Sequence, residues 1–185
     1  NILFDRVEKQ YRQNLINIVS VARHSVEPVL KKVRSGEISR AEAIERIRPM
    51  IRAMTYEDRD GKNYVFMTSY NGTTLVQPLD PAQEMKNRLD LRVIKGVYIL
   101  RELIKAAKTT PEGSFVRYHY PHFSRTTDIE EKLTYVVGLP EIECYIATGM
   151  YMKRIIQEQR ETLAKAKYAA ILLLFVLLIP IFVSV

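Results

Sequence analysis

The sequence predicts an α+β fold, in which helices pack on a β-sheet. Two observations support this prediction. Apolar residues recur every three or four positions up to about residue 55, and short runs rich in β-branched and aromatic residues follow. A further helical segment near 90–108 separates a hairpin from a later group of three strands, so we expect a sheet of about five strands.

Residues 2–33 are expected to form one long helix, because their apolar side chains make a single stripe along it. Pro28 lies inside this segment and should kink or restart the helix, since proline removes a backbone donor and crowds the preceding turn. Gly36 is expected to end it.

A second helix is expected after Ser39, which forms a capping box with Glu42. Pro49 should bend or shorten this helix. The polar stretch "YEDRDGKN" then connects the helices to the strands. We therefore predict an N-terminal helical region at residues 1–55 and a sheet domain at residues 56–152.

Asn71-Gly72 lies in the middle of "YVFMTSYNGTTLVQP" and predicts a hairpin, because both central residues of a type I′ turn need positive φ. Residues 90–108 return to helical spacing, and Pro111 and Gly113 end that helix. The strings "SFVRYHY", "KLTYVVGL" and "CYIATGMY" are then the three later strands.

The end of the chain has a different character. Tyr151 to Ile179 contain no helix breaker and predict one helix, of which residues 153–168 are basic and residues 169–185 carry no charge. At helical rise the uncharged segment covers roughly 26 Å, close to the ~30 Å core of a bilayer. We expect a juxtamembrane helix at 153–168 and a truncated transmembrane segment at 169–185.

The net charge of +7 and the pI of 9.5 are compatible with nucleic acid or with a membrane surface as a partner. The basic residues gather before the uncharged segment, and no groove-reading or base-stacking motif accompanies them. A membrane partner is therefore expected and nucleic acid is not. Cys144 is the only cysteine, which forbids an internal disulfide.

The order of these parts, together with several local strings, resembles the single Cache domain of the second type, found in bacterial transmembrane receptors. The resemblance covers about residues 15–155. It is carried by "SGEISRAEAIERI", "NYVFMTSYNGTTLVQP", "YHYP", "EKLTYVVGLPE" and "CYIATGMYMKRI". The chain departs from the family pattern at Gln77-Pro78, where His-Pro is usual, at Tyr120 and Tyr145, where Trp is usual, and at Arg92, where a second acid is common.

The resemblance implies a long N-terminal helix on a curved five-stranded antiparallel sheet of the PAS type, followed by a helix that continues into a membrane span. It also implies a homodimer, a first span before Asn1, and an inner-membrane receptor whose residues 1–168 are extracytoplasmic. The family binds small organic acids, so the expected partner is a small carboxylate, with no cofactor.

Groups suited to a carboxylate are present, since a buried carboxylate needs charge-assisted donors. Residues two apart on a strand share a face, which pairs Tyr118 with Tyr120 and Tyr64 with Phe66. The candidate ligand-binding residues are Lys132, Tyr118, Tyr120, Tyr64, Phe66, Gln77, Tyr135, Arg92 and Arg101. Tyrosines at alternating strand positions are also typical of a packed core, and Lys132 could equally lie in a solvated turn.

No catalytic residues are predicted, because no nucleophile elbow, phosphate loop or Ser-His-Asp order can be assembled. His119 and His122 are three apart and would face opposite sides of a strand, so we predict no metal site. The predicted function is an extracytoplasmic ligand-sensing domain of a chemoreceptor, histidine kinase or diguanylate cyclase. The alternative is a membrane-anchored interaction or structural domain that binds another protein.

Overall fold

The computed structural model describes residues 2–58, 61–92, 96–122 and 125–183. In chain order the elements are α1 (Ile2–Arg34), α2 (Arg40–Arg52), β1 (Thr55–Asp58), β2 (Gly61–Tyr64), β3 (Phe66–Ser69), β4 (Thr74–Val76), η1 (Pro81–Gln83), α3 (Ile99–Thr109), β5 (Ser114–His122), β6 (Arg125–Leu139), η3 (Pro140–Ile142), β7 (Cys144–Tyr151) and α4 (Met152–Val183).

The central feature is a five-stranded sheet with the order β4-β3-β7-β6-β5. Every neighbouring pair in it is antiparallel. Strands β1 and β2 form a separate two-stranded antiparallel sheet. The predicted α+β class, with a long N-terminal helix, a five-stranded antiparallel sheet and a C-terminal helix, is confirmed.

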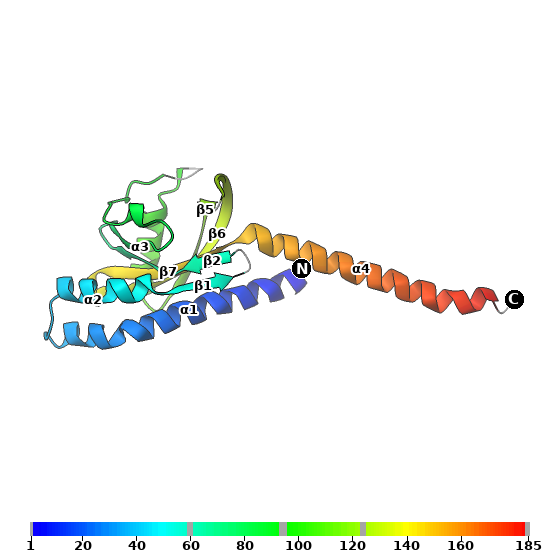
Figure 1. Cartoon of the computed structure of the whole chain (residues 1–185), viewed down its shortest axis with the longest axis horizontal. Coiled ribbons are helices and arrows are strands. Elements are labelled where there is room, and N and C mark those ends of the chain that lie inside the picture. The colour runs from blue at the N-terminus through cyan, green and yellow to red at the C-terminus, as the bar shows by residue number, and fades with distance from the viewer. Residues whose placement is uncertain (1, 59–60, 93–95, 123–124, 184–185) are drawn as a thin grey trace.

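The two faces of the sheet pack against different helices, as Figure 1 shows. Helices α1 and α2 cover one face, where their apolar stripes meet residues such as Leu133, Val137 and Ile146. Helix α3 packs on the other face, against Val136 and Ala147. This division follows from strand geometry, because successive residues of β6 and β7 point to opposite faces.

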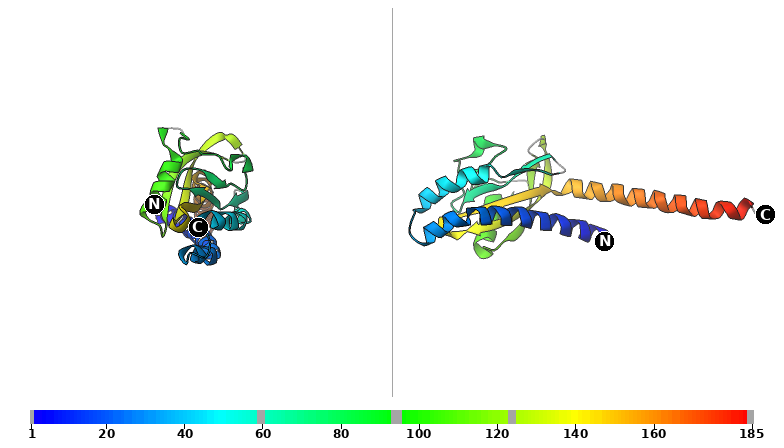
Figure 2. Two further views of the ribbon diagram at one scale, coloured as in Figure 1. Left: turned by 90° about the vertical axis from the view of Figure 1, so that its left-hand side faces the viewer. Right: turned by 60° about the horizontal axis from the view of Figure 1, so that its bottom comes forward.

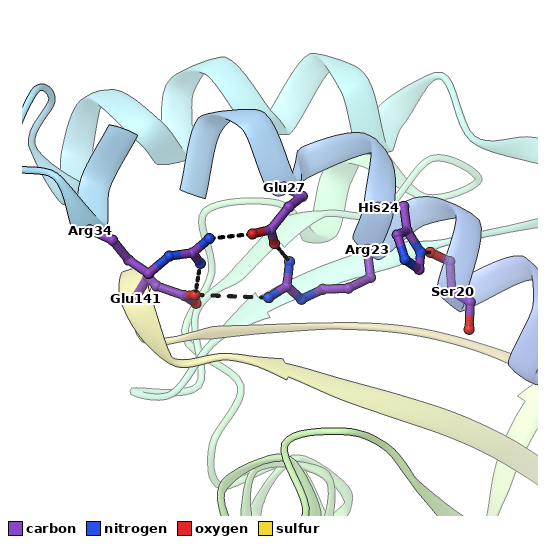
Figure 3. Close-up of polar contacts among 6 residues, drawn as sticks. All are labelled: Ser20, Arg23, His24, Glu27, Arg34 and Glu141. Atoms are coloured by element: carbon purple, nitrogen blue, oxygen red, sulfur yellow. Dashed lines mark hydrogen bonds and ion pairs between the residues drawn. The ribbon is translucent and has the colours of Figure 1, made fainter. Parts of the chain in front are cut away.

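An ion-pair cluster ties the C-terminal half of α1 to the turn between β6 and β7 (Figure 3). Arg34 contacts the carboxylates of both Glu27 and Glu141. Arg23 bonds Glu27 and lies 3.8 Å from Glu141. Because Glu141 belongs to η3, the cluster fixes α1 to the turn between β6 and β7.

Three local predictions need correction. Helix α1 does not restart at Pro28, and α2 continues through Pro49 to Arg52. The hairpin between β3 and β4 forms around Asn71-Gly72, but only the glycine has positive φ, so the turn is not type I′. Its loop is wider, with the Ser69 amide donating to the Thr73 carbonyl and the Ser69 hydroxyl bonding Asn71 Oδ1.

Two element boundaries also differ from the prediction. The polar stretch expected to be a connector contains most of β1 and of β2. The expected first strand is split, with Tyr64 in β2 and Phe66 in β3. Helix α3 begins at Ile99 rather than near residue 90, and residues 93–95 of the expected helix lie outside the described residues.

Helix α4 begins at the residue that follows β7 and projects away from the rest of the molecule (Figure 2). No helix in the described part of the chain has both the length and the apolar character needed to cross a membrane. The transmembrane segment predicted at 169–185 is thus not shown, and its residues 184–185 lie outside the described residues.

Candidate functional site

A small buried cavity lies on the α3 face of the sheet. The space open to the centre of a water-sized sphere is about 40 Å³. This is room for about three water molecules, so a ligand of the enclosed volume is small. The lining comes from β2, β3, β4, α3, β5, β6, β7 and the connection after β4. Its residues are Tyr64, Phe66, Thr68, Thr74, Gln77, Arg88, Ile99, Leu100, Leu103, Tyr118, Tyr120, Lys132 and Tyr145.

Lys132 is the most unusual residue of this pocket, because it is a lysine with only 5% of its surface exposed. Its Nζ lies 5.0 Å from the ring centroid of Tyr151, 5.6 Å from that of Tyr64 and 5.8 Å from that of Tyr120. Burial lowers its pKa from 10.5 to about 8, while the negative charge of Asp58 acts in the opposite direction. The site therefore holds a cation at neutral pH that is surrounded by aromatic rings and has no direct ion pair among the described residues.

Tyrosine side chains build the walls of the pocket. Tyr118 lies directly across the β5–β6 ladder from Lys132, and its hydroxyl bonds Thr134 Oγ1 at 2.9 Å. The ring of Tyr120 meets that of Tyr118 edge to face, with centroids 6.2 Å apart. Burial raises the pKa of Tyr118, so this hydroxyl stays neutral. Such hydroxyls can donate to an anion without adding negative charge.

Tyr64 and Gln77 also line the pocket. The Gln77 Nε2 donates to the Tyr64 hydroxyl at 2.6 Å, which orients both side chains. Burial raises the pKa of Tyr64 as well. The ring of Phe66 packs next to Tyr64 with a centroid distance of 6.3 Å and supplies an apolar wall.

The structure thus brings together six of the nine residues predicted from the sequence. Tyr135 lies elsewhere, because it is three positions from Lys132 and so faces α1, where its hydroxyl donates to the Glu112 carbonyl at 3.2 Å. Arg92 and Arg101 are exposed beside Tyr98, and Arg101 is also paired with Asp90. These three residues do not line the pocket.

Two polar lining residues were not predicted as ligand-binding. Arg88 follows β4 and donates to the Tyr120 hydroxyl at 3.2 Å. Tyr145 is completely buried, and within the described residues its hydroxyl has no hydrogen-bond partner. Alternation along β7 from Tyr151 places Tyr145 on the pocket face and could have identified it. Arg88 had no such signal, since its position depends on how the connection folds back over the sheet.

The charges of the lining define what the pocket can hold. Two of the lining residues, Lys132 and Arg88, are cationic, and the lining contains no carboxylate. Two wider hollows beside α1 have volumes of about 330 and 320 Å³ by the same measure, and their linings carry different charges from that of the pocket. One includes Glu57 and Asp58, and neither includes a basic residue. Of these three hollows in the described part of the chain, the pocket under α3 is therefore the one that suits a small anion.

A five-stranded antiparallel sheet with helices on both faces and a buried cationic pocket is an arrangement suited to binding a small ligand. The chain matches the model of the family Single Cache domain 2 over residues 7–165, and it belongs to this family. It is thus a Cache sensor domain, of the kind found in chemoreceptors and histidine kinases. Sensor Cache domains are not themselves catalytic.

A curated relative is the sensor histidine kinase MctS of Rhizobium johnstonii, which is 26% identical over 144 residues. The match covers 78% of this chain but only 29% of MctS, so the chain spans less than a third of that protein.

Among solved structures, a methyl-accepting chemotaxis protein of Vibrio parahaemolyticus superposes with a TM-score of 0.67 at 19% identity, covering 82% of this chain and 95% of the other. A Cache chemosensory domain described for its recognition of carboxylic acids also gives a TM-score of 0.67, at 17% identity, over 79% and 98% of the two chains. A periplasmic sensor domain of a chemotaxis protein gives 0.61 at 17% identity, over 77% and 98%. These similarities show a shared fold.

Proposed function

We propose that this chain is the extracytoplasmic sensing domain of a bacterial transmembrane receptor and that it binds a small carboxylate in the pocket under α3. The observation that carries the proposal is the buried ammonium of Lys132. A lysine held in a pocket at a depressed pKa is costly for the protein alone. A ligand carboxylate reduces that cost by supplying a counter-charge in direct contact with the ammonium, which the charge of Asp58 does not provide.

The neighbouring groups support the same ligand class. Arg88 adds a second positive charge, and the hydroxyls of Tyr118 and Tyr120 are additional donors. Charge-assisted hydrogen bonds of this kind contribute about 1.5–3 kcal/mol each. The small volume favours acids of a few carbon atoms. One solved structure of the same fold is described as recognising carboxylic acids, which adds to this support.

Signalling is proposed to run from β6 and β7 into α4. Lys132 on β6 pairs with Tyr151, the last residue of β7, and α4 begins at the next residue. A ligand that moves Lys132 would therefore move the base of α4 without an intervening loop. Such signals in receptors involve displacements on the order of 1–2 Å and require that the ligand bind one of two states more tightly.

The membrane context and the homodimer are also proposals. The uncharged residues 169–185 and the basic approach at 153–168 support placement at the inner membrane, with residues 1–168 outside the cytoplasm. The apolar hollows along α1, next to the exposed Val21, support a second copy of the chain as partner. Sedimentation of residues 1–168 would test the dimer.

Isothermal titration calorimetry with acetate, propionate, pyruvate and lactate tests the ligand proposal, using methylammonium and glycerol as cationic and neutral controls. Binding of at least one acid, together with its loss in Lys132→Met, is the expected result. Tyr135→Phe is the matched control, because that hydroxyl faces α1 and should not affect binding. If no acid binds and no thermal shift occurs, the alternative of a protein-binding interaction domain is favoured.

A further inference from the structure

The hydroxyl of Tyr145 is a buried donor that has no acceptor in the described part of the structure. Tyr145 is 0% exposed and lines the pocket. The side chain of its cross-strand neighbour Thr68 is close enough to lower the pKa of the Tyr145 hydroxyl, as a weak hydrogen bond would. The contact falls outside hydrogen-bond geometry, however, so Thr68 does not satisfy this hydroxyl. Buried hydroxyls almost always have a partner. An unsatisfied one that borders a cavity therefore points to an acceptor from outside the protein.

The position of this hydroxyl is fixed by packing. The edge of one ring meets the face of the other where Tyr145 packs against Phe66, with centroids 6.2 Å apart and planes at 83°. Burial raises the pKa of Tyr145, while the positive charge of Arg88 acts in the opposite direction. The hydroxyl is thus a neutral donor in a positive local potential, which suits an electron-rich oxygen and not a second donor.

Tyr145 and Lys132 are at different places along the same pair of strands. In the β6–β7 register, Lys132 is opposite Tyr151, whereas Tyr145 is opposite Gly138. Both side chains nevertheless reach the same pocket. A carboxylate bound at Lys132 through both of its oxygens would leave the Tyr145 hydroxyl unsatisfied. A ligand with a further oxygen could bind Lys132 through its carboxylate and accept a hydrogen bond from Tyr145 through that oxygen.

We propose that Tyr145 is a specificity-determining residue that donates to a second oxygen function of the ligand, so that the pocket prefers oxygen-substituted small acids over plain alkanoates of equal size. This inference rests on the proposed function, since it assumes that the carboxylate occupies Lys132. The second oxygen is a hydroxyl, a carbonyl or a second carboxylate. The small volume of the pocket favours short ligands of about three or four carbons.

Calorimetric affinities for two matched sets of acids test the proposal. The first set compares propionate with lactate and pyruvate, and the second compares butyrate with succinate. Wild-type protein should bind the oxygen-bearing member of at least one set about tenfold more tightly, because one buried hydrogen bond is gained. Tyr145→Phe should reduce this preference to near onefold without weakening the alkanoate. Which set responds shows whether the second oxygen is adjacent to the carboxylate or at the far end.

Tyr135→Phe is the control, since it removes a tyrosine hydroxyl on the opposite face and should leave the preference unchanged. A preference that persists in Tyr145→Phe, or equal binding of both members of each set by the wild-type protein, would overturn this inference alone. Absence of binding by every acid would overturn the proposed function and this inference together.

A stability measurement tests the premise without any ligand. Because the Tyr145 hydroxyl is unsatisfied, Tyr145→Phe should leave the melting temperature unchanged or raise it. A clear decrease in the melting temperature would show that the hydroxyl has a partner within the protein and would refute the proposal.

Discussion

Replacing Lys132 by methionine should make the protein more stable and unable to bind carboxylates. Burial lowers the lysine pKa from 10.5 to about 8, a difference that disfavours the charged form by about 3 kcal/mol. Cation–π contacts with the three rings offset part of this cost, by about 0.5–1 kcal/mol each. Methionine keeps most of the volume and needs no counter-charge. The expected gain in the free energy of unfolding is therefore up to about 1.5 kcal/mol at pH 7.

The sign of the pH dependence follows from the same pKa. Below pH 8 the lysine is protonated in both the folded and the unfolded protein, so the free-energy cost of burying its charge does not change with pH. Between pH 8 and 10.5 the unfolded chain holds the proton more tightly, so the stability of the wild-type protein from this group rises with pH. The advantage of Lys132→Met should shrink over this range. The groups that face Lys132 are the rings of Tyr64, Tyr120 and Tyr151 and the charge of Asp58.

Urea denaturation at pH 7 and at pH 9.5 measures the stability change, and calorimetry measures binding. Lys105→Met is the matched control, because Lys105 is exposed on α3 and should change neither quantity appreciably. Affinity of the wild-type protein for a carboxylate should also fall above pH 8, since the anion needs the protonated lysine. A loss of stability in Lys132→Met at pH 7, or retained carboxylate binding, would refute the reasoning.

Three further predictions concern the scaffold. Gly138→Ala should destabilise the protein by about 1–3 kcal/mol, because the new Cβ would lie 2.5 Å from the Ala107 carbonyl oxygen where α3 meets β6; an unchanged urea midpoint would contradict this. Ile47→Ala should cost about 2–5 kcal/mol in the same assay, since Ile47 is completely buried between α2 and the sheet, and a cost below 1 kcal/mol would argue against that packing. Glu141→Gln should cost about 1 kcal/mol by weakening the cluster at α1, whereas the exposed Glu143→Gln should cost almost nothing; equal melting temperatures for the two variants would count against the cluster.

The order of the elements could be predicted because each long element has a clear periodicity. The stripe of α1 and the strand strings around Lys132 are examples, and the alternation rule also placed Tyr118 and Tyr120 correctly on one face. The same rule excludes Tyr135, which is an odd number of positions from Lys132. Tyr135 was included for its chemical type, without counting its position on the strand.

Other features depend on tertiary contacts that no local pattern encodes. Strands β1 and β2 are polar, and they are held in part by Asn63, whose side-chain amide donates to the Gly149 carbonyl at 2.9 Å. Arg88 reaches the pocket because the connection after β4 pairs back onto that strand, through a bridge between Thr73 and Asn87. Within the described residues the Tyr145 hydroxyl lacks a hydrogen-bond partner, and this too becomes visible only when its surroundings are known.

The alternation of side chains in β6 has a consequence for how such domains diversify. Lys132 contacts the pocket, whereas Leu133, the next residue, packs in the core against α1. Strand β6 thus separates the pocket from the core, and each of its side chains lies on one of these two faces only. Substitutions that change ligand specificity can therefore accumulate on the pocket face while the packing of the sheet against α1 stays unchanged.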